Sequence, residues 1–180
     1  MKKSIIILTL TIILLKCSFC QDWIRVFGIT NNAKAFSIIE AYDNGYIIGG
    51  HYRHNNYLWY FGWLLKTDIN GELLWDIKLG NQNGSYGTII SDVEQTSDGG
   101  LIMTGSTYVF NNPDGFILKL NACGEKEWCT IYKSDAWMDY STHVHQLVNG
   151  GYIMDFHYWG NDLENKRIWL FRMEIGRAHV

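Results

Sequence analysis

Proline and charged side chains are scarce in this sequence of 180 residues. It contains 1 Pro, and 15 Lys and Arg stand against 18 Asp and Glu, for a formal net charge of −3. So few basic residues disfavour a nucleic-acid-binding surface, and the absence of a Gly-X-Y period excludes collagen. A hydrophobic fraction of 47% excludes a disordered chain. Aromatic residues, by contrast, make up 15% of the sequence, which is typical of a β-rich protein.

Catalytic signatures are also missing. The sequence contains no Gly-x-Ser-x-Gly, Gly-x-Gly-x-x-Gly, Walker loop or His-Glu-x-x-His motif, so no catalytic residue and no cofactor are predicted. His143 and His145 would share one face of a strand and could approach a metal together. Because two imidazoles do not complete a tetrahedral site, an exposed strand face is the favoured interpretation of this pair.

The N-terminus has the parts of an export signal. Residues 1–3 are basic, residues 5–15 are apolar, and Ser18 and Cys20 are small residues at the −3 and −1 positions before Gln21. We therefore predict a signal peptide over residues 1–20, with cleavage before Gln21 and export of the mature chain. Cleavage would leave 12 basic against 18 acidic side chains, a net charge of −6.

Two alternatives for this segment are less favoured. A retained membrane anchor is one, but the apolar run is too short to cross a bilayer and Lys16 interrupts it. Lipidation at Cys17 or Cys20 is the other, but neither cysteine follows the small residue that a lipobox requires. The mature chain is therefore expected to have no transmembrane span.

Two cysteines remain after cleavage, Cys123 and Cys129. An exported chain enters an oxidising compartment, where two such thiols tend to pair. A disulfide that closes a small loop around Gly124 is preferred over free thiols, although spacing by itself does not establish the geometry. A zinc site is disfavoured because no second Cys or His pair lies nearby.

The sequence repeats itself three times. Trp23, Trp75 and Trp128 stand 52 and 53 residues apart, and similar turn and apolar segments recur between them. Each unit contains four short strand-like segments, the first of which begins at the Trp. Tandem four-stranded units of about 50 residues are typical of β-propeller blades. We therefore predict an all-β fold with almost no helix, in which residues 23–74, 75–127 and 128–174 are three blades of a truncated β-propeller.

Two columns of residues recur in the same place in these units. The aromatic column is expected to pack blade against blade, and it comprises Trp63, Phe116 and Trp169 together with Trp75 and Trp128. The basic column, Lys66, Lys119 and Arg172, is interpreted as a solvated or carboxylate-paired position of the repeat. Neither column is expected to bind a ligand, because each recurs in every unit.

The last residues break the repeat. Residues 174–180 match the translation of a common sequencing adapter, so residues 175–180 are interpreted as read-through at the end of a fragment. A genuine diverged terminus is the alternative. Because closed propellers have about four to eight blades, three units predict that further blades are missing.

The repeat resembles that of exported proteins of Bacteroidetes-type bacteria that end in a type IX secretion sorting domain. The resemblance is carried by residues 35–50, by residues 64–75, by the Cys-Gly-Glu-Lys-Glu-Trp-Cys element at 123–129, and by Gln21 after the cleavage site. It covers residues 21–174 and implies export and a propeller-type fold. It implies no activity, and the expected truncation would explain why the sequence shows no sorting domain.

These features predict a secreted or cell-surface, non-catalytic binding or scaffold module with an unknown extracellular protein or carbohydrate partner. Binding is expected on the loops at 52–60, 81–86, 108–114 and 159–166, with Trp59, Tyr60, Tyr108 and Trp159 as candidate contacts. One alternative is a propeller-based extracellular enzyme, glycan-processing or quinone-dependent, with its catalytic residues in missing blades. Another is a lectin-like carbohydrate binder, although the mannose motif of bulb lectins is absent.

Overall fold

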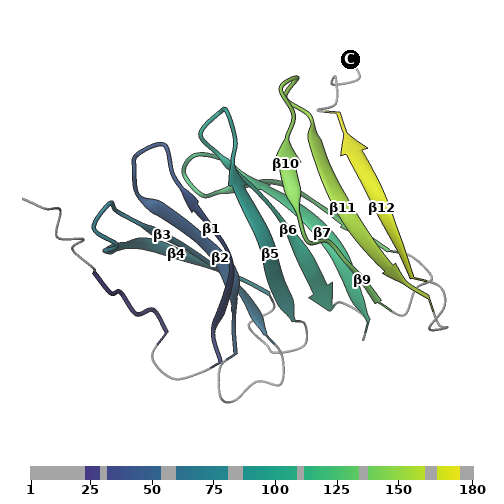
Figure 1. Cartoon of the computed structure of the whole chain (residues 1–180), viewed down its shortest axis with the longest axis horizontal. Helices are drawn as coiled ribbons and strands as arrows, with labels where there is room; N and C mark the ends of the chain where they lie inside the picture. The colour runs from purple at the N-terminus through teal and green to yellow at the C-terminus, as the bar shows by residue number, and fades with distance from the viewer. Residues whose placement is uncertain are drawn as a thin grey trace, which may run out of the picture.

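The computed structural model describes residues 23–28, 32–53, 60–80, 87–108, 112–133, 138–160 and 166–174. These residues form strands and turns without any helix, and so none of them belongs to a helix that could cross a membrane. The strands build three antiparallel sheets that lie face to face (Figure 1), which confirms the all-β prediction and its tandem four-stranded units. The predicted signal peptide, its cleavage site and the tail at 175–180 lie outside the described residues.

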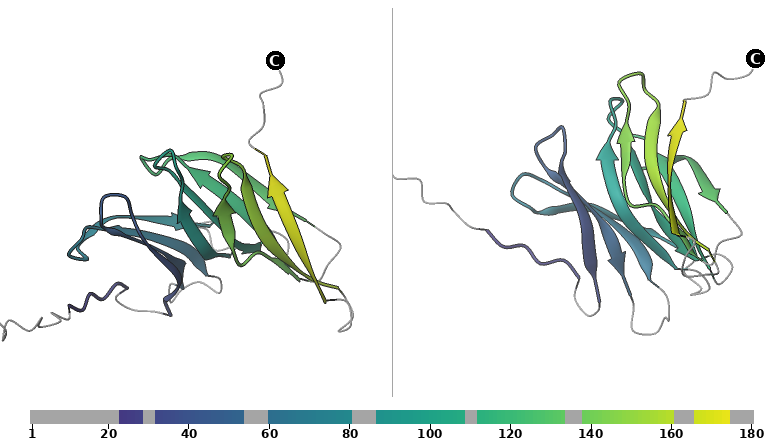
Figure 2. Two further views of the ribbon diagram at one scale, coloured as in Figure 1. Left: turned by 45° about the horizontal axis from the view of Figure 1, so that its top comes forward. Right: turned by 45° about the vertical axis from the view of Figure 1, so that its right-hand side comes forward.

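Each sheet is a meander of neighbouring strands. The first sheet has the order β1-β2-β3-β4 and comprises Lys34–Glu40, Tyr46–Tyr52, Phe61–Thr67 and Leu73–Leu79. The second has the order β5-β6-β7-β8 and comprises Thr88–Gln95, Leu101–Tyr108, Pro113–Leu120 and Lys126–Tyr132. In the third, β9 (Met138–Tyr140) and β10 (Val144–Gln146) both pair with β11 (Tyr152–Trp159), and β12 (Lys166–Met173) follows. The three sheets fan out side by side, as Figure 2 shows from two further directions.

The sheets are offset by one strand from the predicted units. The strand that contains Trp75 is the last strand of the first sheet, and the strand that contains Trp128 is the last of the second. A tight turn causes this grouping: Gly71 has a φ of 75°, and the Asp68 carboxylate accepts hydrogen bonds from the backbone N–H groups of Asn70 and Glu72. Such a short turn can only return the chain along the strand it has just left.

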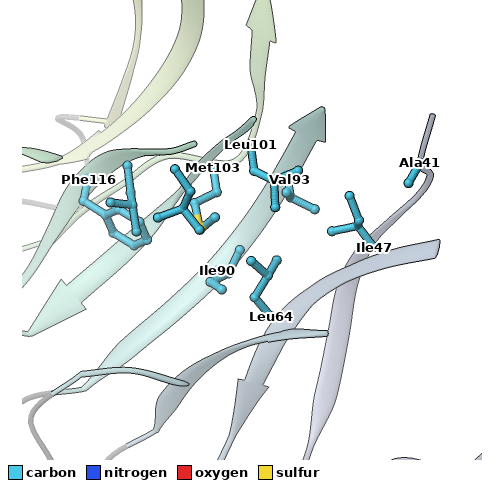
Figure 3. Close-up of a cluster of buried hydrophobic side chains, with 10 residues drawn as sticks. Ala41, Ile47, Leu64, Ile90, Val93, Leu101, Met103 and Phe116 are labelled. Carbon is cyan, nitrogen blue, oxygen red and sulfur yellow. The ribbon is translucent and has the colours of Figure 1, made fainter. Parts of the chain in front are cut away.

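The hydrophobic core lies between the sheets. Side chains from both facing sheets fill the first interface (Figure 3), among them Ile47 and Leu64 from one side and Ile90, Val93 and Met103 from the other. The second interface holds Ile102, Ile117, Val144, Tyr152, Met154 and Phe156. Middle strands therefore bury both faces, as their continuous apolar sequences predict.

The aromatic column packs only in part as predicted. Phe116 is buried in the first core, and Trp75 and Trp128 pack against the two cores from the outer strands. Trp63 is half-buried, and its indole N–H donates to Asp76 at 2.9 Å. Trp169 remains 40% exposed in the edge strand β12, so its prediction as a packing residue is wrong.

In each of the first two sheets, a glycine in the second strand lets the backbone of the first strand approach closely. The inner strands β1 and β5 carry a β-bulge at this point. A Cβ atom on Gly50 would overlap the carbonyl oxygen of Lys34, and one on Gly105 would overlap that of Ile89. No side chain can therefore stand at either position without moving the backbone.

The third sheet has Phe156 at the corresponding position, and its inner strand is interrupted. Residues 141–143 leave the ladder between β9 and β10. The Phe156 ring is buried between Tyr132 and Phe171, with centroids 5.2 Å from both. The large side chain thus gains core packing in the third sheet, where the close backbone contact of the other two is absent.

In the first two sheets, the lysine of the basic column forms an ion pair with the aspartate of a tight turn. The buried Lys66 ammonium lies 2.7 Å from Asp43 Oδ1 and donates to the Thr67 carbonyl at 2.9 Å. The equivalent Lys119 Nζ lies 3.0 Å from Asp98 Oδ2 and 2.9 Å from the Leu120 carbonyl oxygen. This agrees with the carboxylate-paired interpretation, although the lysine side chains are buried and not solvated.

The third sheet lacks this ion pair because its turn has an asparagine. Asn149 stands where the other turns have aspartate, and Arg172 is exposed and lies 3.7 Å from Glu174. In the second sheet the pKa of Asp98 is lowered to about 2. Hydrogen bonds from the Thr96 hydroxyl and the Gly100 N–H outweigh the effect of burial, and Lys119 lowers the pKa further. The pKa of Asp43 is likewise lowered, chiefly by Lys66.

Candidate functional site

The long connections of all three sheets leave the strands at one end, which we call the loop end. Its strand termini pair across each sheet as Tyr52 with Phe61, Tyr108 with Pro113, and Trp159 with Lys166. Tight turns occupy the opposite end (Figure 1). Tyr60, Tyr108 and Trp159 lie at the loop end, whereas Trp59 and residues 81–86 lie outside the described residues.

Tyr60 and Tyr108 lie at the junction of the first two sheets. The Tyr60 carbonyl accepts a hydrogen bond from the Thr88 N–H at 2.8 Å, and the Tyr108 N–H donates to Gly87 at the same distance. Burial raises the pKa of Tyr108, with a smaller contribution from Tyr60. The Arg53 guanidinium lies 5.9 Å from the centre of the Tyr60 ring. The structure thus brings these two predicted residues together.

Trp159 is held within the third sheet. The Lys166 ammonium lies 4.3 Å from the centre of its ring, a cation–π contact, and the Tyr140 ring stands edge-on at 6.4 Å. Tyr140 in turn stacks on His157 with the ring centres 4.8 Å apart. The loop end therefore presents two aromatic groups, one at the junction of the first two sheets and one on the third.

His51 is a buried polar residue near this end, and no motif of the sequence identified it. It lies in β2, buried between the rings of Phe36 and Tyr60, whose centres are 5.3 and 4.3 Å away. Among the described residues, neither imidazole nitrogen has a hydrogen-bond partner. Burial, and to a lesser degree Lys34, lowers the pKa of His51, so a neutral imidazole lines a mainly apolar cavity of about 180 Å³.

We predict that His51 makes the folded state sensitive to mild acid. In the unfolded chain this residue takes up a proton near pH 6.5, whereas the folded state resists protonation, so stability falls as the pH drops below that value. Thermal melts between about pH 7.5 and 5.5 should show this loss, and His51→Phe should reduce it. At neutral pH the variant should be more stable by about 1 kcal/mol, because no unpaired nitrogen stays buried. An unchanged pH profile in the variant would contradict the assignment.

Two buried carboxylates also lie near the loop end, and sequence reasoning missed both. Asp114 belongs to β7 and Asp139 to β9, so they meet where the second and third sheets face each other. Burial raises the pKa of Asp114, which Lys133 opposes and Asp139 reinforces. Neither aspartate recurs in a motif, so only the packing of the two sheets reveals the pair.

His143 and His145 contact different carboxylates. His143 Nδ1 lies 3.2 Å from Asp155 Oδ2, within the third sheet, whereas His145 Nδ1 lies 3.1 Å from Glu94 Oε2 of the second sheet. Burial acts to raise the pKa of Asp155, but hydrogen bonds from Thr142 and His143 outweigh it and hold that pKa well below its usual range. Within the described ranges, no three His, Cys, Asp or Glu side chains gather as metal ligands would.

The predicted disulfide is wrong. Cys123 and Cys129 are both exposed free thiols. Cys123 lies in the turn before β8, and Cys129 lies three residues along that extended strand. Three residues of strand span about 10 Å, which is more than a disulfide bridges between its Cα atoms.

Comparison with known proteins adds no relative. The chain matches no protein-family model and no curated protein sequence. The loop end is therefore interpreted from its own residues.

Proposed function

We propose that this chain is a secreted or cell-surface binding module that contacts an extracellular carbohydrate or protein through its loop end. The observation that supports this proposal best is the gathering of Tyr60, Tyr108 and Trp159 at one end of three stacked sheets. Aromatic side chains with a polar or cationic neighbour offer a large contact area at a small entropic cost. Stacked sheets are rigid, so they hold such residues in place before a partner arrives.

A neutral polysaccharide is the first partner to test, because pyranose rings stack on aromatic side chains. We expect the chain to be retained on at least one of insoluble cellulose, chitin, xylan or mannan. Trp159→Ala and Tyr60→Ala should each weaken this retention at least tenfold, about the effect of losing a central aromatic contact. Affinity electrophoresis with soluble forms of the same glycans measures the ratio of the dissociation constants of variant and parent chain.

Tyr42→Ala is the control, because Tyr42 is an exposed aromatic residue that lies in a tight turn at the opposite end. It should leave retention unchanged. Loss of binding in the Tyr42 variant alone, or equal binding by all variants, would contradict the proposal. Binding of a host or bacterial surface protein in place of any glycan, with the same dependence on Trp159 and Tyr60, would identify the partner as a protein.

A glycan-processing enzyme is the second candidate, and the buried Asp114 beside Asp139 favours it. A carboxyl group with a raised pKa next to a second carboxylate is the arrangement that glycoside hydrolysis uses. Release of reducing sugar from the same glycans by the parent chain, and not by Asp114→Asn, would support this candidate. Release that the substitution leaves unchanged would exclude a role for Asp114.

A further inference from the structure

Four cations near the tight turns are paired with carboxylates. A carboxylate oxygen lies 2.7 to 3.7 Å from the charged nitrogen in each of Arg25, Lys66, Lys119 and Arg172. Because an acidic side chain already compensates each of these charges, none of the four is available to a ligand at little cost.

Two cations of the loop end lie on aromatic rings instead. The Lys166 ammonium is 4.3 Å from the centre of the Trp159 ring, and the Arg53 guanidinium is 5.9 Å from that of Tyr60. Among the residues that the structure describes, neither cation is in an ion pair. An aromatic ring attracts a cation but carries no net charge, so both positive charges remain uncompensated.

The two cation–aromatic pairs occupy corresponding positions of the first and third sheets. Trp159 and Lys166 are the last cross-strand pair between β11 and β12. In the first sheet the same two positions hold Arg53 and Tyr60, which adjoin the last pair of β2 and β3. The aromatic residue and the cation have thus changed places, while the pair itself is present in both sheets.

This exchange separates the pairs from the parts of the repeat that maintain the fold. The second sheet has a tyrosine and a proline at these two positions, so the strands form without a cation there. The basic column at the tight turns, by contrast, keeps a cation at one strand position in all three sheets. A cation beside an aromatic ring is therefore a property of the loop end that the sheets do not require.

A further cation adds to the positive charge around Tyr60. The Tyr60 ring packs on the His51 ring, with the centres 4.3 Å apart, and the exposed Lys34 stands opposite His51 on β1. Burial lowers the pKa of His51, and the charge of Lys34 lowers it further. The field of Lys34 thus reaches the interior side of the Tyr60 ring.

The described carboxylates nearest these strand ends are withdrawn from the surface. Asp114 is 8% exposed and Asp139 is 4% exposed, so neither offers a charge to a ligand in solvent. Asp135, Asp162 and Glu164 stand in connections outside the described residues. The inference therefore rests on the two cation–aromatic pairs and not on the net charge of this end.

We propose that the loop end binds a glycan whose sugar units carry an anionic group, a carboxylate or a sulfate. This inference rests on the proposed function and narrows its class of ligand. The sugar ring packs on Trp159 or Tyr60, and the anionic group pairs with Lys166 or Arg53 beside that ring. Hydrogen bonds between ionised groups are stronger than those between neutral ones, and a cation already held at the ring loses little freedom on binding.

Matched pairs of polymers test the proposal on the purified chain. Polygalacturonate is compared with its methyl ester, and dextran sulfate with dextran, so each pair differs chiefly in charge. In affinity electrophoresis at least one charged polymer should bind about tenfold more tightly than its neutral counterpart, because two exposed ion pairs contribute. Added salt should reduce this ratio by screening the charges. The pair that shows the ratio identifies the anionic group as carboxylate or sulfate.

Single substitutions then assign the charge effect to the named cations. Lys166→Gln and Arg53→Gln should each weaken binding of the charged polymer about fivefold, the upper end for one exposed ion pair. Both should leave binding of the neutral counterpart unchanged, and Lys166→Arg should bind as the parent chain does. Lys126→Gln is the matched control, because Lys126 is an exposed cation at the opposite end of the sheets.

The outcomes separate this inference from the proposed function. Equal binding of charged and neutral polymers would overturn the inference and leave the proposed function standing. An equal loss of both polymers in Lys166→Gln would overturn it too, because it would show that Lys166 only holds Trp159 in place. The same holds if Lys126→Gln weakens binding as much as the loop-end variants do. If the chain binds no polymer and no surface protein, the proposed function itself is wrong.

Discussion

Gly105→Ala is expected to destabilise the chain by about 3 kcal/mol, the upper part of the range for forcing atoms into a packed interior. The added methyl group would overlap the carbonyl oxygen of Ile89 at the β-bulge of the central sheet. A backbone carbonyl cannot turn aside as a side chain can, so the bulge itself must open. Urea-induced unfolding followed by tryptophan fluorescence measures the loss.

Gly49→Ala is the matched control for this prediction. Its added methyl group would lie 3.0 Å from a methyl group of Ile90 and 3.3 Å from one of Val93, both of which can yield. The equivalent positions in the other sheets hold Thr104 and Asp155, so this site tolerates a side chain. The expected cost is about 1 kcal/mol or less. Equal losses in the two variants would show that the bulge contact does not matter.

Asp98→Ala is expected to cost about 3 kcal/mol, which combines lost turn hydrogen bonds with a buried ammonium group left poorly compensated. Asp98 holds Lys119 Nζ at 3.0 Å, and the lysine side chain is only 2% exposed. After the substitution, Glu127 at 3.3 Å and the Leu120 carbonyl at 2.9 Å are the contacts described for that ammonium. The same unfolding experiment measures the effect.

Two further variants separate the contribution of the turn hydrogen bonds from that of the buried ion pair. Asp68→Ala removes a comparable set of turn hydrogen bonds, from Asn70 and Glu72, without leaving a buried lysine behind, and should cost about 1 kcal/mol. Lys119→Met in the Asp98→Ala background should recover the difference, since an apolar side chain of similar shape needs no counter-charge. If the double variant is no more stable than Asp98→Ala alone, the ion pair is not the source of the loss.

The local sequence was sufficient to predict the strands and the turns between them. Asn44, Gly71, Gly99, Gly124 and Gly150 all adopt positive φ in turns that the repeat predicts. The continuous apolar runs of the middle strands agree with their burial on both faces. The grouping of strands was not predictable from the period, because a repeat has the same length wherever its first residue is placed. The hairpin turn at Asp68 decided it.

The candidate site was less predictable than the fold. Loop composition singled out Tyr60, Tyr108 and Trp159 as candidate contacts, but nothing local indicated that Tyr60 and Tyr108 meet across two sheets while Trp159 stays within the third. His51 belongs to no motif of the sequence, yet it is buried in β2. Its burial depends on Phe36 and Tyr60, which are distant in sequence and adjacent only in the folded sheet.

The sequence by itself determined the properties that repeat: the all-β class, the three four-stranded units, the turns with positive φ, and the basic column. Each depends on neighbours within one hairpin, where spacing along the chain fixes spacing in space. Only the tertiary structure decided the approach of Asp114 to Asp139 and the exposure of Leu170 and Ile38 at opposite ends. These features depend on which sheet lies against which, and a periodic sequence specifies that only through side chains that meet across the stack.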